Sequence, residues 1–507
     1  MVFVDGSLTL DEPWDHPGYL NLITWSLGSH HIGRYIRPCL NVSPCVSPTV
    51  FRLWIKAIHS WNKGFFLGYS IETLPSLLVF LIKLLAVRIN SLRGKPPTAA
   101  TLPSLASVLF PVKSVPLAVF FGTFSASYGI LRVVLSRLIF KITGGDPHSL
   151  VQAPSPMSSS NSLVSLEQQQ QQQSPPKGRE RIHPLATFLA GTVAGAAILL
   201  DAERHGKERR VTLALYLLVR AGEVAAESGV KRGLLPSFYH ADTLLFTLSC
   251  AEIMYSWFFT PETLPPAYDR WITRLADMDP RIMKYLRQRR AGTVNLGEHS
   301  DTLLSYALDN HLDPALADPR NGFLDCVVNH PDCGSHCSMN SYKRLRNGFL
   351  SSLLIYLPVH FLPLIFWRFG ALKNKPAEMI LKTALASARS AAFLGTYISL
   401  IWSSVCLVRN LVKDDTIYGP MLGSFMCGLS LLIEKKSRRL ELALYCFPRA
   451  IGSLALKAER NHLLPVIPGF ETFLFAVSSG AFLYFFEHEP DVMKPTFVSF
   501  LRWLLKN

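Results

Sequence analysis

Charged residues are scarce in this sequence. They make up 17% of its 507 residues, whereas a soluble protein carries about 25%. Apolar residues make up 49%, and the mean hydropathy is +0.23. Burial of helices in lipid explains this deficit better than an unusually large soluble core, since a bilayer accepts apolar surface that water does not. The composition therefore predicts an integral membrane protein.

Acidic residues are the scarcer charge class. There are 36 Asp and Glu against 51 Lys and Arg, which gives a net charge of +15. Such an excess indicates either nucleic-acid binding or basic loops that face anionic lipid and fix topology. The basic residues flank apolar segments here, which favours the second interpretation. We expect membrane lipids as partners and no nucleic acid.

Enzyme signatures are absent from the sequence. It has no P-loop, no dinucleotide fingerprint, no G-x-S-x-G elbow, no H-E-x-x-H motif and no acyltransferase-like His-x4-Asp. The first twenty residues have neither a basic region nor an apolar run, so they are not a signal or transit peptide. We therefore expect a protein without catalytic residues that uses internal insertion signals.

Cysteine is too sparse for a disulfide scaffold, with nine in the whole sequence. The densest polar group has three thiols and two imidazoles: Cys326, His330, Cys333, His336 and Cys337. Four of them would suffice for a structural zinc ion, although the spacing is not that of a standard finger or ribbon. The alternative is a cysteine-rich loop that braces the chain without metal. Cys250, Cys406, Cys427 and Cys446 lie in apolar segments, where cysteine usually acts as a small hydrophobe.

The sequence does contain two related halves. Arg209–Ala221 returns as Arg438–Ala450, with 8 of 13 positions identical at an offset of 229. Upstream, Phe120–Phe124 matches Phe393–Tyr397 at an offset of 273. The difference of 44 matches a Ser/Pro/Gln-rich insert at residues 144–183, which we expect to be disordered. A duplicated set of apolar segments is typical of membrane proteins built from two homologous halves.

The apolar segments follow one another in the same order in each half. Those of the first half are Gly64–Val87, 115–140, Pro184–Leu200, Val211–Ala226 and Ala241–Phe259, and those of the second are Gly348–Trp367, Ala377–Val408, Met421–Ile433, Leu440–Leu454 and Phe470–Phe486. We expect an all-α integral membrane protein with two tandem homologous halves of four to five apolar helices each.

Five regions follow from this pattern. They are an N-terminal Cys/His-containing segment at 1–60, a first membrane repeat at 61–260, a polar linker at 261–345, a second membrane repeat at 346–490 and a C-terminal tail at 491–507. The linker is predicted to hold a basic amphipathic helix at residues 279–290, and to continue as loop through the Cys/His-rich residues.

Topology follows from the short basic loops at residues 201–210 and 434–439, which occupy matching places in the two halves. The positive-inside rule puts both on one side of the membrane, so an even number of crossings separates them. This favours four spans per half in parallel orientation, with the first apolar segment of each half not fully crossing. Five spans per half in inverted orientation is the alternative.

Two arginines lie inside the repeated apolar helix. Arg220 and Arg449 each follow a tyrosine by four residues, Tyr216 and Tyr445, so each pair shares a helix face. An ionisable group at membrane depth is a functional candidate, whereas an arginine near the end of a short span only snorkels to the interface. Nearby acidic residues are candidate partners: Glu223, Asp242, Glu252 and Glu471.

Small residues predict close helix packing in both halves. Gly191 and Gly195 form a GxxxG pattern, and Ser424 and Gly428 form its counterpart in the second half. Such faces let helix backbones approach closely, which matters where lipid removes the hydrophobic driving force.

The segment Gly428–Ala450, with its copy Ala190–Ala221, resembles the transmembrane protein 135 family. The residues ahead of the second half also resemble that family's cysteine-rich region. More distantly, the helical core is similar to mitochondrial inner-membrane translocase channel proteins and to a small peroxisomal membrane protein. The resemblance implies a multi-pass protein of peroxisomal or mitochondrial membranes, with roles in organelle dynamics and in lipid or fatty-acid handling. It supplies no catalytic residue.

Three functions are consistent with these observations. We expect first an organelle membrane protein that handles lipids or metabolites, with the two halves enclosing a polar cavity. The alternative is a scaffold that recruits soluble fission or trafficking factors through the polar linker, and a third reading is a protein-translocation channel. The first function needs the two membrane arginines, whereas the second does not.

Overall fold

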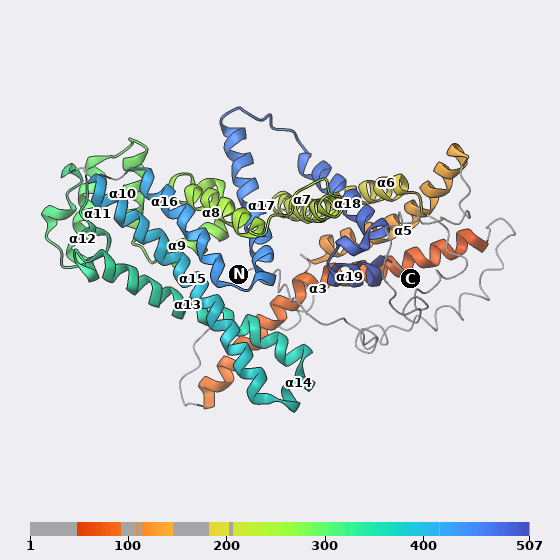
Figure 1. Ribbon diagram of the computed structural model, residues 1–507, viewed down its shortest axis with the longest axis horizontal. Coiled ribbons are helices and arrows are strands. Elements are labelled where there is room, and N and C mark those ends of the chain that lie inside the picture. Colours follow the sequence, from red (N-terminus) through yellow and green to blue (C-terminus); the bar gives the residue numbers. More distant parts are fainter. Residues whose placement is uncertain are drawn as a thin grey trace, which may run out of the picture. The chain divides into compact units, whose positions relative to one another are not determined.

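The computed structural model describes residues 48–92, 108, 111, 114–144, 182–201, 206–321, 323–414 and 416–505. Every regular element within these ranges is a helix (Figure 1), which confirms the predicted all-α class. Most of the predicted N-terminal Cys/His segment and most of the predicted insert lie outside the described residues.

Each predicted apolar segment falls within a helix. In the first half these are α3 (Pro48–Leu92), α5 (Ser114–Thr143), α6 (Pro184–Gly195) with the 3₁₀ turn η2 (Ala196–Leu200), α7 (Gly206–Lys231) and α8 (Ala241–Phe259). In the second half they are α13 (Cys337–Trp367), α15 (Pro376–Val412), α16 (Tyr418–Met426) with η7 (Cys427–Ile433), α17 (Lys436–Arg460) and α18 (Phe470–His488). The 3₁₀ turn therefore follows the short small-residue helix in both halves.

Three of these helices are long and apolar enough to cross a membrane. The qualifying stretches are Ser114–Thr143, Cys337–Ile365 and Pro376–Val412, and two shorter apolar helices cover Pro184–Leu200 and Tyr418–Ile433. A span needs about 20 apolar residues because each residue advances the helix by only about 1.5 Å. These lengths fit an integral membrane protein.

The polar linker is more helical than expected. It contains η3 (Pro261–Thr263), α9 (Pro266–Ala276), α10 (Pro280–Arg290), α11 (Leu296–Asp309), η4 (Pro314–Ala317), η5 (Pro319–Asn321), α12 (Cys326–Asn329) and η6 (Pro331–Cys333). Helix α10 coincides with the predicted amphipathic helix. Helix α11 lies where loop was expected, and it forms because Leu303 and Ala307 are fully buried against Ile282 and Tyr285 of α10.

The chain divides into two compact units that do not follow the order of the sequence repeats. Unit 1 contains Pro236–Ile467, and unit 2 contains the described residues before 236 together with those after 467. Helix α8 therefore packs with α17 and α16 in unit 1, where its Trp257 ring also meets Trp402 of α15, whereas α18 packs with α6 and α7 in unit 2. The last apolar helix of each predicted repeat thus belongs to the unit built mainly from the other repeat. Helix α19 (Pro495–Leu505) completes unit 2.

We call α8 and α18 the exchanged helices, because each packs in the unit built mainly from the other repeat. In each unit a glycine of the short small-residue helix contacts the exchanged helix. A β-carbon on Gly195 would lie 2.7 Å from the Cα of Ala476 on α18, and one on Gly428 would lie 2.6 Å from the Cα of Thr247 on α8. Ala476 and Thr247 are 229 positions apart, which is the repeat offset. Helix α18 and helix α8 are therefore held by the same kind of backbone contact, in which no side chain separates the helices.

The other two predicted small residues also lie in helix contacts. A β-carbon on Gly191 would lie 2.9 Å from the Cα of Gly480 on α18. Ser424 is 1% exposed, and its hydroxyl donates to the Pro420 carbonyl at 2.6 Å. The pattern in the first half is thus a direct backbone contact between helices, and in the second half Gly428 makes such a contact beside the buried Ser424.

The packing of α8 on α17 predicts a specific cross-link between these two helices. The hydroxyl oxygens of Ser256 on α8 and Ser453 on α17 are 2.8 Å apart and buried. We expect the double variant Ser256→Cys/Ser453→Cys to form a disulfide within one chain under mild oxidation, detected by mass spectrometry of the linked peptides.

The matched control uses Val224, which occupies the position equivalent to Ser453 in the repeat (453 − 229 = 224) and is buried in unit 2. The pair Ser256→Cys/Val224→Cys should stay reduced. Efficient linkage of this second pair, with none of the first, would mean that α8 packs on α7 of its own repeat.

Candidate functional site

Four side chains converge at one point in unit 1. They come from the start of α12 (Cys326), the residue after it (His330), the start of α13 (Cys337) and the interior of α15 (Cys406). One ligand atom from each, a thiol sulfur or an imidazole nitrogen, lies within 4.8 Å of all the others. The side chain of Asp325 accepts from the Cys326 amide at 2.6 Å and so caps the short helix α12. We call these four residues the Cys3His group.

The Cys3His group is largely shielded from solvent. Cys326, His330 and Cys406 are 2%, 5% and 4% exposed, and Cys337 is half-buried. Asn410, one turn after Cys406 on α15, donates through its side-chain amide to the Cys337 sulfur at 3.2 Å and accepts from the Cys326 thiol at 3.7 Å. The His330 Nε2 lies 3.5 Å from the Cys337 sulfur. Amide donors that orient sulfur in this way are typical of the residues around metal ligands.

The surroundings of Cys326 favour its thiolate. Hydrogen bonding from the Cys406 thiol, supported by His330 and the nearby Arg409, lowers the pKa of Cys326 well below its usual range. Arg409 is 3% exposed, donates to the Leu324 carbonyl, and lies 4.9 Å from the Phe323 ring. A positive charge is thus fixed beside the sulfur atoms, and the thiolate is the form of cysteine that binds metals.

The chemistry of this donor set suits a metal ion. Three thiolates and one neutral imidazole form a tetrahedral set with no position left for water or substrate, which is the pattern of structural rather than catalytic zinc sites. A Zn²⁺ ion in such a set would leave one net negative charge, and the buried guanidinium of Arg409 would offset it. The Cys3His group could therefore hold a metal ion.

The structure gathers three of the five residues that the sequence singled out. Cys326, His330 and Cys337 belong to the Cys3His group, whereas Cys333 ends η6 outside it and His336 is exposed at the start of α13. Cys406 was interpreted as a small hydrophobe because it lies in an apolar run. The sequence did hold a signal that Cys406 belongs to a polar site. Arg409 and Asn410 follow Cys406 by three and four residues, so the apolar helix carries a polar stripe on that face.

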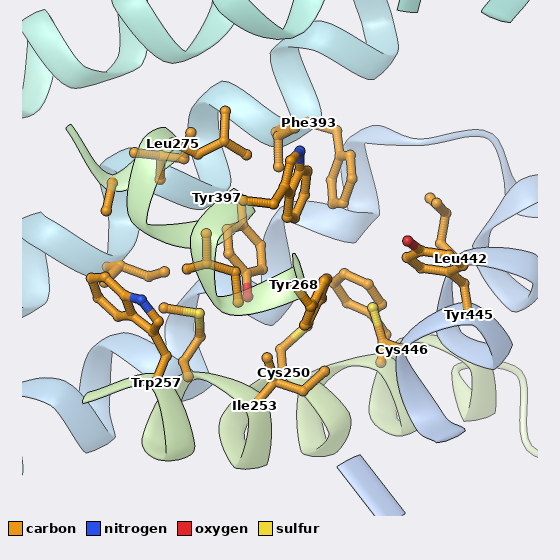
Figure 2. A pocket seen from close by; sticks show the side chains of 18 of the residues that line it. Cys250, Ile253, Trp257, Tyr268, Leu275, Phe393, Tyr397, Leu442, Tyr445 and Cys446 are labelled. Atoms are coloured by element: carbon orange, nitrogen blue, oxygen red, sulfur yellow. The ribbon is translucent and has the colours of Figure 1, made fainter. Parts of the chain in front are cut away.

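A second feature of unit 1 is an apolar cavity (Figure 2). It has a volume of about 120 Å³, and its walls come from α8, α9, α13, α15 and α17. Nine of its lining residues are aromatic, and no charged side chain of the described residues lines it. Its polar groups are the hydroxyls of four tyrosines, the indole N–H groups of three tryptophans and the thiols of Cys250 and Cys446. Small-molecule sites have this mostly apolar character.

The two predicted Tyr–Arg pairs exist but have different partners. In unit 2, the Nε of Arg220 donates to the Tyr216 hydroxyl at 3.2 Å, and its Nη1 forms an ion pair with Glu223 at 2.9 Å. In unit 1, the Arg449 guanidinium lies 3.8 Å from the Tyr445 ring centroid. Among the residues that the structure describes, no carboxylate pairs with Arg449.

The other predicted acidic partners bind different cations. Asp242 pairs with Lys436 at 3.0 Å, Glu252 with Lys457 at 2.8 Å, and Glu471 with Arg210 at 3.5 Å. Each acid lies on α8 or α18, and each cation lies on α17 or α7 of the same unit. These ion pairs therefore join the exchanged helices to their units.

Sequence reasoning missed two buried carboxylates in the basic loops. Asp201 is fully buried and accepts from the Arg209 Nε at 2.6 Å. Glu434 is 2% exposed and pairs with Arg438 at 3.6 Å. Two arginines that had been counted toward topology are thus neutralised within the protein, which weakens the positive-inside argument at these loops. The sequence feature that could have revealed these ion pairs is the acidic residue at the start of each loop.

Comparison with known proteins gives no family assignment. No protein-family model matches the chain, and no solved structure matches it. The site is therefore interpreted from its own residues.

Proposed function

We propose that this chain is a multi-pass protein of a peroxisomal or mitochondrial membrane, built from two homologous halves related to the transmembrane protein 135 family, that handles lipids or apolar metabolites and takes part in organelle dynamics. The observation that carries the proposal is the aromatic-lined cavity in unit 1. A cavity of this kind removes an apolar molecule from water, or from the bilayer, without a catalytic group.

The three long apolar helices support the membrane part of the proposal. Two of them, α13 and α15, also form walls of the cavity. A ligand would therefore reach the cavity from the membrane more readily than from water, since apolar molecules partition into the hydrocarbon layer.

Fractionation tests the location. Tagged protein at its endogenous level should follow peroxisomal or mitochondrial markers and should stay in the pellet after carbonate extraction. Recovery in the carbonate supernatant, or enrichment with another membrane, would refute the proposal. A deletion strain should then show altered lipid profiles if the protein is peroxisomal, or altered network shape if it is mitochondrial.

The scaffold function ranks second because the polar linker has few free apolar surfaces on its amphipathic helix. Ile282, Tyr285 and Leu286 of α10 are buried within the linker. Arg281 pairs with Asp309 at 2.7 Å and Arg289 with Asp414 at 2.7 Å. The apolar face of α10 and two of its arginines are thus already engaged within unit 1.

We also propose that the Cys3His group holds a structural zinc ion. The ion would join the linker residues Cys326 and His330 to the membrane-length helices through Cys337 and Cys406. Elemental analysis of the purified protein, prepared without added metal, should find about one zinc ion per chain. A preparation that is folded and free of metal would refute this proposal and leave the organelle function untouched.

A further inference from the structure

One member of the Cys3His group is accessible to solvent. Cys337 is half-buried, whereas the other three members are buried. The residues beside it in the chain are exposed: Ser335, His336, Ser338 and Met339. Cys337 begins α13, so it lies where the linker meets that helix. A small reagent in water therefore reaches the group first at Cys337.

A second thiol lies close to the sulfur of Cys337. The side chain of Asn410 joins the two, because its amide donates to the Cys337 sulfur at 3.2 Å and its oxygen accepts from the Cys326 thiol at 3.7 Å. The two sulfur atoms are within 4.8 Å of each other. Cys326 begins α12, a helix of only four residues. A disulfide between these cysteines needs side-chain rotation and a small shift of that short helix, and it needs no movement of α15.

These observations indicate a reactive cysteine in a site that is otherwise closed. We propose that Cys337 is an oxidation site, where a hydroperoxide oxidises the sulfur, Cys326 then forms a disulfide with it, and the metal ion is released. The inference rests on the proposed structural zinc ion and adds its regulation. The susceptibility of a cysteine to oxidation rises with its exposure, and Cys337 is the most accessible member of the group.

The reaction balances in two steps. In the first, the Cys337 thiolate attacks the hydroperoxide: an S–O bond forms, the O–O bond breaks, and the leaving oxygen takes a proton to become water or an alcohol. The sulfur is oxidised by two electrons to a sulfenic acid, and the hydroperoxide is reduced. In the second, the Cys326 thiolate attacks that sulfur: an S–S bond forms, the S–O bond breaks, and the leaving hydroxide takes a proton to become water.

A buried cation favours the second step. Arg409 is 3% exposed, and its positive charge acts on the Cys326 sulfur. The thiolate is the nucleophile in disulfide formation, and a neighbouring positive charge stabilises it. Cys333 is close to Cys326 in the sequence, but it ends η6 outside the Cys3His group and so is not placed to react with Cys337.

Oxidation would separate the linker from α15. Once Cys326 and Cys337 are joined to each other, only His330 and Cys406 remain as ligands, whereas a structural zinc site has four. The linker then stays joined to the start of α13 and loses its connection through the metal ion to α15. We therefore expect the oxidised protein to unfold at a lower temperature, because the free energy of metal binding contributes to folding.

The test treats the full-length, zinc-containing protein in lipid nanodiscs with hydrogen peroxide. Zinc release is followed with a metallochromic indicator, and the disulfide is located by mass spectrometry after free thiols are alkylated. We expect release of the bound zinc together with a disulfide between Cys326 and Cys337. Both changes should be reversed by a reductant and added zinc.

Two variants separate oxidation of Cys337 from damage to the fold. Cys337→His replaces the thiolate by an imidazole, which leaves a Cys2His2 set that still suits zinc but has no sulfur to oxidise at this position. It should bind zinc and should no longer release it to hydrogen peroxide. Cys333→Ser, the matched control, should release zinc as the unaltered chain does. If Cys337→His does not bind zinc, the disulfide found in the unaltered chain decides the question.

Two results would overturn the inference. One is zinc that stays bound while hydrogen peroxide oxidises other cysteines of the protein. The other is zinc release accompanied by a disulfide that does not contain both Cys326 and Cys337. Absence of zinc before any treatment would refute the proposed metal site as well, so failure of that site is distinguishable from failure of the oxidation step alone.

Discussion

Replacing Cys406 by serine should remove the metal from the purified protein and destabilise unit 1. Cys406 is 4% exposed and supplies the one ligand that comes from the interior of α15. Serine keeps the size of the side chain but is a poor zinc ligand. Because metal binding to such a set is largely folding free energy, we expect a loss of more than about 4 kcal/mol. The measurements are zinc content and thermal unfolding, each relative to the unaltered chain.

Cys333 provides the matched control for this experiment. It is also nearly buried, at 9% exposed, and it lies within the same stretch of the linker, yet it is not part of the Cys3His group. Cys333→Ser should keep its zinc and lose little stability. If both variants keep zinc, the group is not the metal site. If Cys333→Ser alone loses zinc, the ligands are those that local sequence density suggested, and Cys406 is not among them.

The helices that contain the ten apolar segments could be predicted from the sequence, because each is marked by a local run of apolar residues, whereas α11 of the linker was not. The packing partners could not. Helices α8 and α18 are similar in sequence. A sequence pattern that allows α8 to pack on α7 of its own repeat therefore also allows it to pack on α17 of the other repeat. The choice depends on contacts such as Glu252 with Lys457, which join residues 205 positions apart. Pairings of that range leave no periodic signal in the sequence.

The same distinction explains the outcome at the candidate site. Cys326, His330 and Cys337 were recognised because they are neighbours in the sequence, whereas Cys406 lies 69 residues further on (406 − 337) and is surrounded by apolar residues. The Tyr–Arg pairs followed from helical spacing alone. Which arginine has an acid within reach could also be read from the sequence, since Glu223 follows Arg220 by three residues and Gly452 stands at the matching place after Arg449.

Substitution of Gly195 by alanine should destabilise unit 2, although alanine is the better helix former. A β-carbon at Gly195 would lie 2.7 Å from the Cα of Ala476, and backbone atoms cannot move aside as a side chain can. Helix α18 would have to shift away from α6, and we expect a loss of about 1–3 kcal/mol. Gly195→Val should cost more. Thermal unfolding in nanodiscs measures both.

Gly222→Ala is the control for this prediction, because it should change the free energy of unfolding in the opposite direction. It lies inside α7, and a β-carbon there meets no atom within 4 Å. With no contact to lose, Gly222→Ala should stabilise the protein by about 0.5–1 kcal/mol, because alanine restricts the unfolded chain more than glycine does. The same chemical change is thus expected to act in opposite directions at two helix positions of one unit. Stabilisation by Gly195→Ala would contradict the close contact of α6 with α18, and with it the exchange of the last apolar helix between the repeats.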